Sequence, residues 1–105
     1  TGTHDNDTAA GWLAHAPAED VGFAVDYLNL TEREGMCFGM ARGVWASIAD
    51  LAIVQIQDVL ELPGETRMNT PGTAAGNWRF RLQAGMPDGA LARRIAHYMR
   101  LYGRA

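Results

Sequence analysis

A short apolar run, Leu51–Ile56, is the feature that most constrains what this chain can fold into. A nearly continuous run of this kind is typical of a parallel strand buried on both faces, because a half-exposed strand alternates apolar and polar residues. Gln57 and Asp58 follow at its carboxyl end, where α/β folds carry their chemistry. One parallel strand needs neighbours, from outside the chain or from a second copy. We therefore expect the chain to be a piece of a larger α/β protein.

The rest of the chain is expected to be mostly helical. Apolar residues at helical spacing predict helices over residues 17–28 and 88–102, and a shorter one over residues 8–15. A further helix is expected behind Thr31–Glu34, which has the S/T-x-x-E pattern of a capping box. Three glycines at four-residue spacing there indicate that another element packs closely against it. Residues 62–89, rich in Pro and Gly, predict a long loop of the kind that is usually functional or disordered.

Length, charge and cysteine content exclude several classes of protein. The 105 residues suit one small domain, residues 1–105. The net charge of −3 provides no basic block for nucleic acid. No apolar run approaches the roughly 18 to 20 residues that span a bilayer, and the first residues have neither an initiator Met nor a signal-peptide core. The single Cys37 is expected to be a buried helix residue, and the lack of an internal disulfide fits a cytoplasmic setting.

The polar start of the chain holds the candidate functional residues His4, Asp5 and Asp7. The residues alone leave three alternatives open. The first is a metal site, since imidazole and carboxylate bind several divalent ions, although no second His or Cys lies at ligand spacing. The second is a general acid/base cluster. The third is a polar turn whose Asn and Asp side chains cap the helix that begins near Thr8.

Two motifs near opposite ends of the chain carry a resemblance to a known family. Residues 1–12 read T-G-T-H-D-N-D-T-x-x-G-W, and residues 67–73 read R-M-N-T-P-G-T, with G-N-W shortly after. Between them lies A-I-V-Q-I-Q-D-V-L, residues 52–60, and the chain closes on L-Y-G-R. In this order and spacing, the segments resemble the amylomaltases, the 4-α-glucanotransferases of glycoside hydrolase family 77.

The resemblance implies a (β/α)8 barrel with its active site at the C-terminal ends of the strands. The His-Asp motif would follow the seventh strand, Leu51–Ile56 would be the eighth, and Asp88–Tyr102 the closing helix. This C-terminal piece would itself be mostly α with one or two short strands. The implied reaction is a retaining transfer of α-1,4-glucan segments between maltodextrins, through a covalent glycosyl-enzyme and without a cofactor or metal.

The resemblance also implies roles for four residues. Asp5 would be the transition-state stabiliser, because its hydrogen bonds to the distorted sugar tighten as positive charge develops. His4 would donate to a hydroxyl of the same sugar, and Asn69 would make a further sugar contact. Trp78 is expected either to stack on a sugar or to be a core or loop-anchoring residue. Loop carbonyls and carboxylates are the expected partners of three arginines: Arg67, Arg79 and Arg81.

The family's attacking carboxylate and proton donor would lie upstream of Thr1, so the isolated chain is expected to lack transferase activity. Three departures from the family pattern affect the loop after the expected strand: Gln55 for Pro, Glu61 for Gly and Phe80 for Trp. An exposed apolar strand is a template for pairing with another chain, which predicts a dimer. The alternative is a non-catalytic, α-rich interaction or oligomerisation module.

Overall fold

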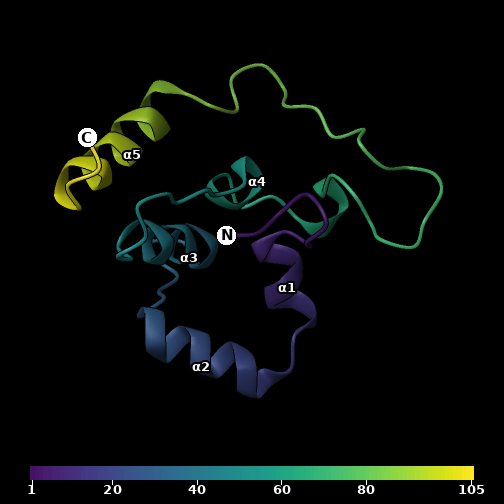
Figure 1. Ribbon diagram of the computed structural model, residues 1–105, viewed down its shortest axis with the longest axis horizontal. Helices are drawn as coiled ribbons and strands as arrows, with labels where there is room; N and C mark the ends of the chain where they lie inside the picture. The colour runs from purple at the N-terminus through teal and green to yellow at the C-terminus, as the bar shows by residue number, and fades with distance from the viewer.

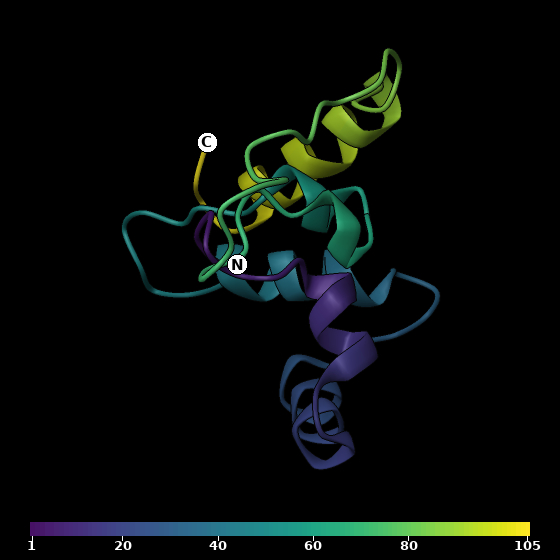
Figure 2. The ribbon, with the colours of Figure 1, turned by 90° about the vertical axis from the view of Figure 1, so that its right-hand side faces the viewer.

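The computed structural model describes residues 1–105, and its regular elements are all helices (Figure 1). Helices α2 and α5 lie at opposite ends of the molecule with α3 and α4 between them, and a long loop arches away before the chain returns to α5 (Figures 1 and 2). None of the helices combines the length and the apolarity that a bilayer crossing requires. In chain order the elements are α1 (Ala9–His15), α2 (Ala18–Leu28), α3 (Met36–Trp45), α4 (Ile56–Val59), the 3-10 helix η1 (Gly64–Thr66) and α5 (Gly89–Leu101).

The expectation of one or two short strands is wrong, although the chain is mostly helical as predicted. Residues 51–55 have no regular structure, and Ile56 already belongs to α4. Thr1 bonds to this run through its nitrogen, 2.6 Å from Ile53 O, and its hydroxyl accepts from Gln55 N at 3.1 Å. A strand requires a ladder of such bonds along a neighbour, and none of the 105 residues supplies that neighbour. Apart from these two bonds to Thr1, residues 51–55 therefore form no strand.

The bounds of α2 and α5 agree to within one residue with the predicted ranges, residues 17–28 and 88–102. Helix α2 begins after Pro17 and ends at Asn29, whose φ of 52° is left-handed. Helix α5 begins after Asp88, whose carboxylate accepts from Leu91 N at 2.8 Å, and the chain turns away at Gly103 with φ 69°. These caps satisfy backbone groups that the helix itself leaves unpaired.

The predicted capping box at the start of α3 forms only in part. Thr31 Oγ1 accepts from Glu34 N at 3.2 Å, but the Glu34 carboxylate turns to Arg42 Nε at 2.8 Å instead of returning to Thr31. Gly35, with φ 99°, delays the helix to Met36. The first amides of α3 are capped by the side chain of Glu61 instead, whose Oε1 accepts from the backbone of residues 37 and 38 at 3.1 and 3.3 Å.

The core lies on one side of α3. Phe38, Ala41 and Trp45 are buried there with Val59 of α4, and we call these four residues the α3 core. The Arg94 guanidinium lies 3.5 Å from the centre of the Phe38 ring. Only 12 of the 105 residues are buried, so much of the apolar surface remains open. Five residues of α5 and its end cover the α3 core, as their spacing predicted: Leu91, Ile95, Tyr98, Met99 and Tyr102.

The glycines of α3 let the preceding segment approach closely, as predicted. A Cβ at Gly39 would lie 2.8 Å from Leu30 Cδ2, and one at Gly43 would lie 2.8 Å from Leu28 Cδ2. Cys37 is a buried helix residue. Its burial, reinforced by the negative charges of Glu61 and Asp58, raises the pKa of the Cys37 thiol to about 11.

The other end of α3 is completed by a distant residue. Arg104 donates from Nε to Trp45 O at 2.6 Å, and from Nη2 to Ser47 O at 3.1 Å and Ala49 O at 2.9 Å. A guanidinium presents several donors in one plane, which suits three carbonyls that follow the end of a helix.

Candidate functional site

His4 and Asp5 occupy the tip of a tight turn, Thr3–Asn6, which we call the site turn. Asn6 N donates to Thr3 O at 3.1 Å, and the Asn6 side-chain oxygen accepts from Thr3 N at 2.7 Å. A side chain that bonds backbone within its own turn fixes the turn without help from the rest of the protein. The two tip side chains are consequently free to face outwards, and they are 54% and 52% exposed.

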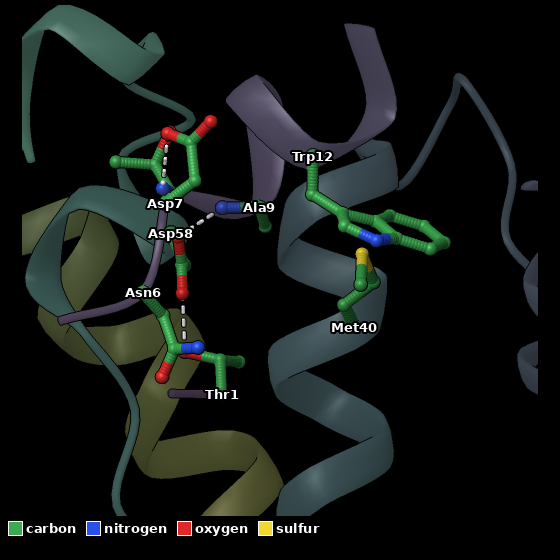
Figure 3. Close-up of a pocket in the computed structure, with 8 residues that line it drawn as sticks. Thr1, Asn6, Asp7, Ala9, Trp12, Met40 and Asp58 are labelled. Atoms are coloured by element: carbon green, nitrogen blue, oxygen red, sulfur yellow. Dashed lines mark hydrogen bonds between the residues drawn. The ribbon is translucent and has the colours of Figure 1, made fainter. Parts of the chain in front are cut away.

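The chain on either side of the site turn is anchored by one buried carboxylate, that of Asp58 (Figure 3). Asp58 is 1% exposed. Its Oδ1 accepts from Ala9 N at 2.7 Å, at the start of α1, and its Oδ2 accepts from the Thr1 hydroxyl. The sequence indicated a polar group after the apolar run, but not that Asp58 would reach the start of the chain. Its role is to anchor the backbone.

The second motif folds into a loop that is closed by its own hydrogen bonds, residues 67–78, which we call the arginine loop. Asn77 Oδ1 accepts from Thr70 N at 2.9 Å, and Asn77 Nδ2 donates to Thr73 O at 3.2 Å. Trp78 N donates to Met68 O at 2.5 Å. Asn77 is thus the residue that holds this loop together, a function that the motif did not reveal.

The structure brings the site turn and the arginine loop into contact. Asn69 Nδ2 donates to Asp5 Oδ1 at 2.6 Å, and Arg67 Nη2 donates to Asp5 O at 3.0 Å. The His4 and Trp78 rings lie with their centres 5.0 Å apart. All four candidate site residues, His4, Asp5, Asn69 and Trp78, therefore gather at one place, although the two motifs are more than 60 positions apart.

Trp78 lies at this place with an unusual backbone. Its φ of 60° is left-handed, a conformation that costs a residue with a Cβ roughly 1–2 kcal/mol. Its side chain is 59% exposed, so the interpretation of Trp78 as a core residue is wrong. The remaining alternatives are a stacking surface for a ligand and an anchor for the loop through contact with His4.

The structure bears on two of the three alternatives left open by the sequence. Helix α1 is capped by Thr8, whose hydroxyl accepts from Gly11 N at 3.1 Å, and not by the Asn and Asp side chains before it. His4 Nε2 and Asp5 Oδ2 lie 3.4 Å apart. Asp7 accepts from Thr8 N at 2.8 Å and faces Arg67 at 4.0 Å. No three His, Cys, Asp or Glu side chains are arranged to hold a metal ion, so the metal alternative finds no supporting geometry.

The three arginines expected to bind loop carbonyls and carboxylates differ in whether the structure gives them such partners. Arg67 binds loop carbonyls and faces a carboxylate, as predicted. Arg79 and Arg81 are exposed and make no hydrogen bond or ion pair, so the same prediction is wrong for them. The Trp-to-Phe departure at Phe80 lies between these two arginines.

A hollow beside the site turn contains Asp7 but none of His4, Asp5, Asn69 and Trp78 (Figure 3). The Asp58 carboxylate in this hollow already accepts hydrogen bonds from Ala9 N and the Thr1 hydroxyl. On the other side of the hollow, Trp12 lies beside Met40 (Figure 3). A second, more open hollow includes His4 and is bordered by Ile53, Gln55 and Met68. The first hollow is lined by Thr1, Asn6, Asp7, Thr8, Ala9, Trp12, Met40 and Asp58.

Comparison with known proteins places these observations in a family. A family model described as 4-alpha-glucanotransferase matches residues 1–87. The chain is 45% identical over 105 residues to a 4-alpha-glucanotransferase of Clostridium butyricum, covering 99% of this chain and 22% of that protein. It is 40% identical over 104 residues to that of Synechocystis sp., covering 99% and 21%.

A solved structure of an amylomaltase is also similar to the chain. The amylomaltase from Streptococcus agalactiae in complex with acarbose is 28% identical and superposes with a TM-score of 0.94, covering 100% of this chain and 21% of that one. The chain thus spans about a fifth of the length of the relatives it matches. Because the family model matches residues 1–87, the chain belongs to the 4-alpha-glucanotransferase family, glycoside hydrolase family 77.

Proposed function

We propose that this chain forms one wall of the active site of an enzyme that transfers α-1,4-glucan segments between maltodextrins. The observation that carries the proposal is the meeting of the two motifs, where Asn69 Nδ2 lies 2.6 Å from Asp5 Oδ1. The relatives carry the name 4-alpha-glucanotransferase, and the solved amylomaltase was in complex with acarbose. A cluster of half-exposed groups that donate and accept hydrogen bonds beside an indole ring suits a sugar.

Asp5 acts as the transition-state stabiliser in this proposal. Cleavage of a glucosidic bond passes through an oxocarbenium-like state, in which the sugar ring gains positive charge. A carboxylate held in place beforehand strengthens its hydrogen bonds to the sugar hydroxyls as that charge develops, so it lowers the barrier more than it tightens ground-state binding. Asn69 holds Asp5 Oδ1 in place. His4 donates to a hydroxyl of the same sugar, and Trp78 supports its ring face.

The attacking carboxylate and the proton donor come, in this proposal, from a part of the enzyme outside these 105 residues. A retaining transfer needs two carboxyl groups about 5–5.5 Å apart. One attacks the anomeric carbon and forms the glycosyl-enzyme while the other protonates the leaving oxygen, and an incoming sugar hydroxyl then takes up the glucan. The (β/α)8 barrel, with residues 51–56 paired as its eighth strand, and a cytoplasmic location belong to the same proposal.

Sugar binding by the chain tests the site. In an NMR titration of the ¹⁵N-labelled chain with acarbose, we expect shifts at His4, Asp5, Asn69 and the Trp78 indole. The indole of Trp45, which lies in the α3 core, serves as the internal control. Asp5→Asn should weaken the shifts, and the matched Asp50→Asn, at an exposed carboxylate far along the chain, should not. Equal shifts at the Trp78 and Trp45 indoles would contradict specific sugar binding at the proposed site.

Activity tests the role of Asp5. The chain alone should release no glucose from maltotriose, and transfer by pure chain would contradict the assignment of the missing carboxylates. In the complete enzyme, Asp5→Asn should lower kcat by on the order of 100-fold or more with little change in KM, as for other groups that act on transition-state charge. A rise in KM with an unchanged kcat would make Asp5 a binding residue only.

A non-catalytic interaction module is the second candidate, and one observation favours it. Helix α2 has no buried residue, and its Phe23 and Tyr27 rings stack on each other while 69% and 78% exposed. The proposed dimer would instead pair the open apolar run, where Leu51 and Ile53 are 76% and 65% exposed. Light scattering of the chain and of a Leu51→Lys/Ile53→Lys variant separates these surfaces, because only pairing through the run is lost in the variant.

A further inference from the structure

One side chain touches both halves of the candidate site. Arg67 donates from Nη2 to Asp5 O at 3.0 Å and from Nε to Asn69 O at 3.0 Å. These are the backbone carbonyls of the two residues whose side chains bond each other at 2.6 Å. The guanidinium therefore fixes the separation between the backbone of the site turn and that of the arginine loop. It does so through backbone carbonyls and not through the Asp5 or Asn69 side chains, and its own side chain is only 24% exposed.

Asp7 holds Arg67 in this position. Asp7 Oδ2 lies 4.0 Å from Arg67 Nη1, and Asp7 Oδ1 accepts from Thr8 N at 2.8 Å. The Asp7 carboxylate occupies space that two glycines leave free, because a Cβ at Gly11 would collide with it and one at Gly64 would lie 2.9 Å from Oδ1. The carboxylate is thus boxed in by the backbone of α1 and η1, and Arg67 is oriented by a fixed charge.

The geometry requires a guanidinium. Nε and Nη2 are separate donors at fixed positions on one planar group, and here they reach two carbonyls on different segments. A lysine ammonium at the same place keeps the positive charge but presents its donors from a single atom on a flexible stem. It can bond one of the two carbonyls or pair with Asp7, but it cannot set the distance between the segments.

We propose that Arg67 is a positioning residue, which holds Asp5 and Asn69 at the spacing that the transition state requires and makes no contact with the sugar. The inference deepens the proposed function and, for its catalytic consequence, rests on it. The structural part stands alone, because the Asp5–Asn69 hydrogen bond exists without any sugar.

The structural part is tested in the full 105-residue chain by NMR. The Asn69 side-chain amide donates to the Asp5 carboxylate at 2.6 Å, so its bonded proton should give a downfield ¹H signal that Asp5→Ala abolishes. In Arg67→Lys and Arg67→Gln this downfield signal should be lost while the Trp45 indole signal is unchanged, which shows that the fold persists. Arg79→Lys, at an arginine without bonds, is the matched control. A downfield Asn69 signal that persists in both Arg67 variants, or is lost in Arg79→Lys, overturns the inference.

The catalytic part is tested in the complete enzyme. A misplacement of about 1 Å at a reacting centre can cost about 100-fold in rate, so Arg67→Lys should lower kcat by that order with little effect on KM for maltotriose. An unchanged kcat together with a lost Asn69 signal would overturn the catalytic role of the spacing. If unaltered chain shows no acarbose shifts at all, the proposed function fails instead, and the NMR result on Arg67 remains independent of it.

Discussion

The α3 core and the pair formed by the site turn and the arginine loop are held together by different forces. Around α3, Phe38 and Ala41 have no exposed surface and are held by packing. At the site, side chains that are more than half exposed are held by a few directional hydrogen bonds. Packing is non-directional and shared among many atoms, whereas a hydrogen bond fixes one geometry. The comparison indicates that the α3 core provides most of the stability, whereas the site turn and the arginine loop fix the positions of the candidate site residues.

The largest loss of stability should come from a substitution in the α3 core. Phe38→Ala removes a ring that contacts Trp45 and Tyr98 at 5.7 Å between centres, and such truncations cost about 3–5 kcal/mol. Urea unfolding followed by circular dichroism measures the loss. Phe23→Ala, at a ring 69% exposed, is the matched control and should change stability by no more than about 0.5 kcal/mol. Equal costs for the two variants would break the comparison.

The next effect concerns reactivity inside the core. With its pKa raised from 9.0 to about 11, the folded Cys37 holds about 100-fold less thiolate than a free thiol at pH 8. Iodoacetamide should therefore alkylate the native chain about 100-fold more slowly than the chain in urea, as followed by mass spectrometry. The unfolded state loses the proton first as pH rises, so Cys37 should also lower stability between about pH 9 and 11. Similar rates in both states would show that the α3 core opens readily.

The next prediction concerns the stability provided by Glu61 at the start of α3. Its side chain caps α3, while its backbone is left-handed with φ 56°, a conformation that favours glycine. Glu61→Ala loses the cap and keeps the strain, so it should cost about 1–2 kcal/mol. Glu61→Gly also loses the cap but relieves about 1 kcal/mol of strain. Urea midpoints should therefore rank the parent chain first, Gly second and Ala last, and a reversed order of Gly and Ala would refute the strain.

The smallest effect should come from the site itself. Asp5→Ala and Trp78→Ala remove side chains that are 52% and 59% exposed, and surface substitutions usually change stability by about 0.5 kcal/mol or less. The same urea experiments provide the measurement. A loss above 2 kcal/mol, as a rough threshold for core substitutions, would mean that the site turn also carries the fold.

The same contrast explains what the sequence could predict. The bounds of α2 and α5 and the covered face of α5 were predictable, because helical spacing acts over a few residues. The grouping of His4, Asp5, Asn69 and Trp78 was expected from the family resemblance and not from spacing, since the two motifs are far apart in the chain.

What could not be predicted depends on partners distant in sequence. The prediction of a strand over residues 51–56 was wrong because strand pairing requires a neighbouring strand, and no local pattern shows whether such a neighbour is present. Glu34 was expected to complete a capping box, but Arg42 competes for its carboxylate and Gly35 breaks the helix start. The cap from Glu61, 24 positions from Cys37, and the anchor from Asp58, 49 positions from Ala9, leave no local signature.

Arg104 binds the carbonyl of Trp45 from 59 positions further along the chain. During synthesis, α3 therefore emerges before the side chain that completes its end, and before the α5 face that covers its core. At about 5–20 residues per second, the interval lasts roughly 3 to 12 seconds. For that time the apolar face of α3 lacks its cover and the last carbonyls of the helix lack Arg104. The nascent chain is therefore open to non-native apolar contacts at α3 until α5 has been made.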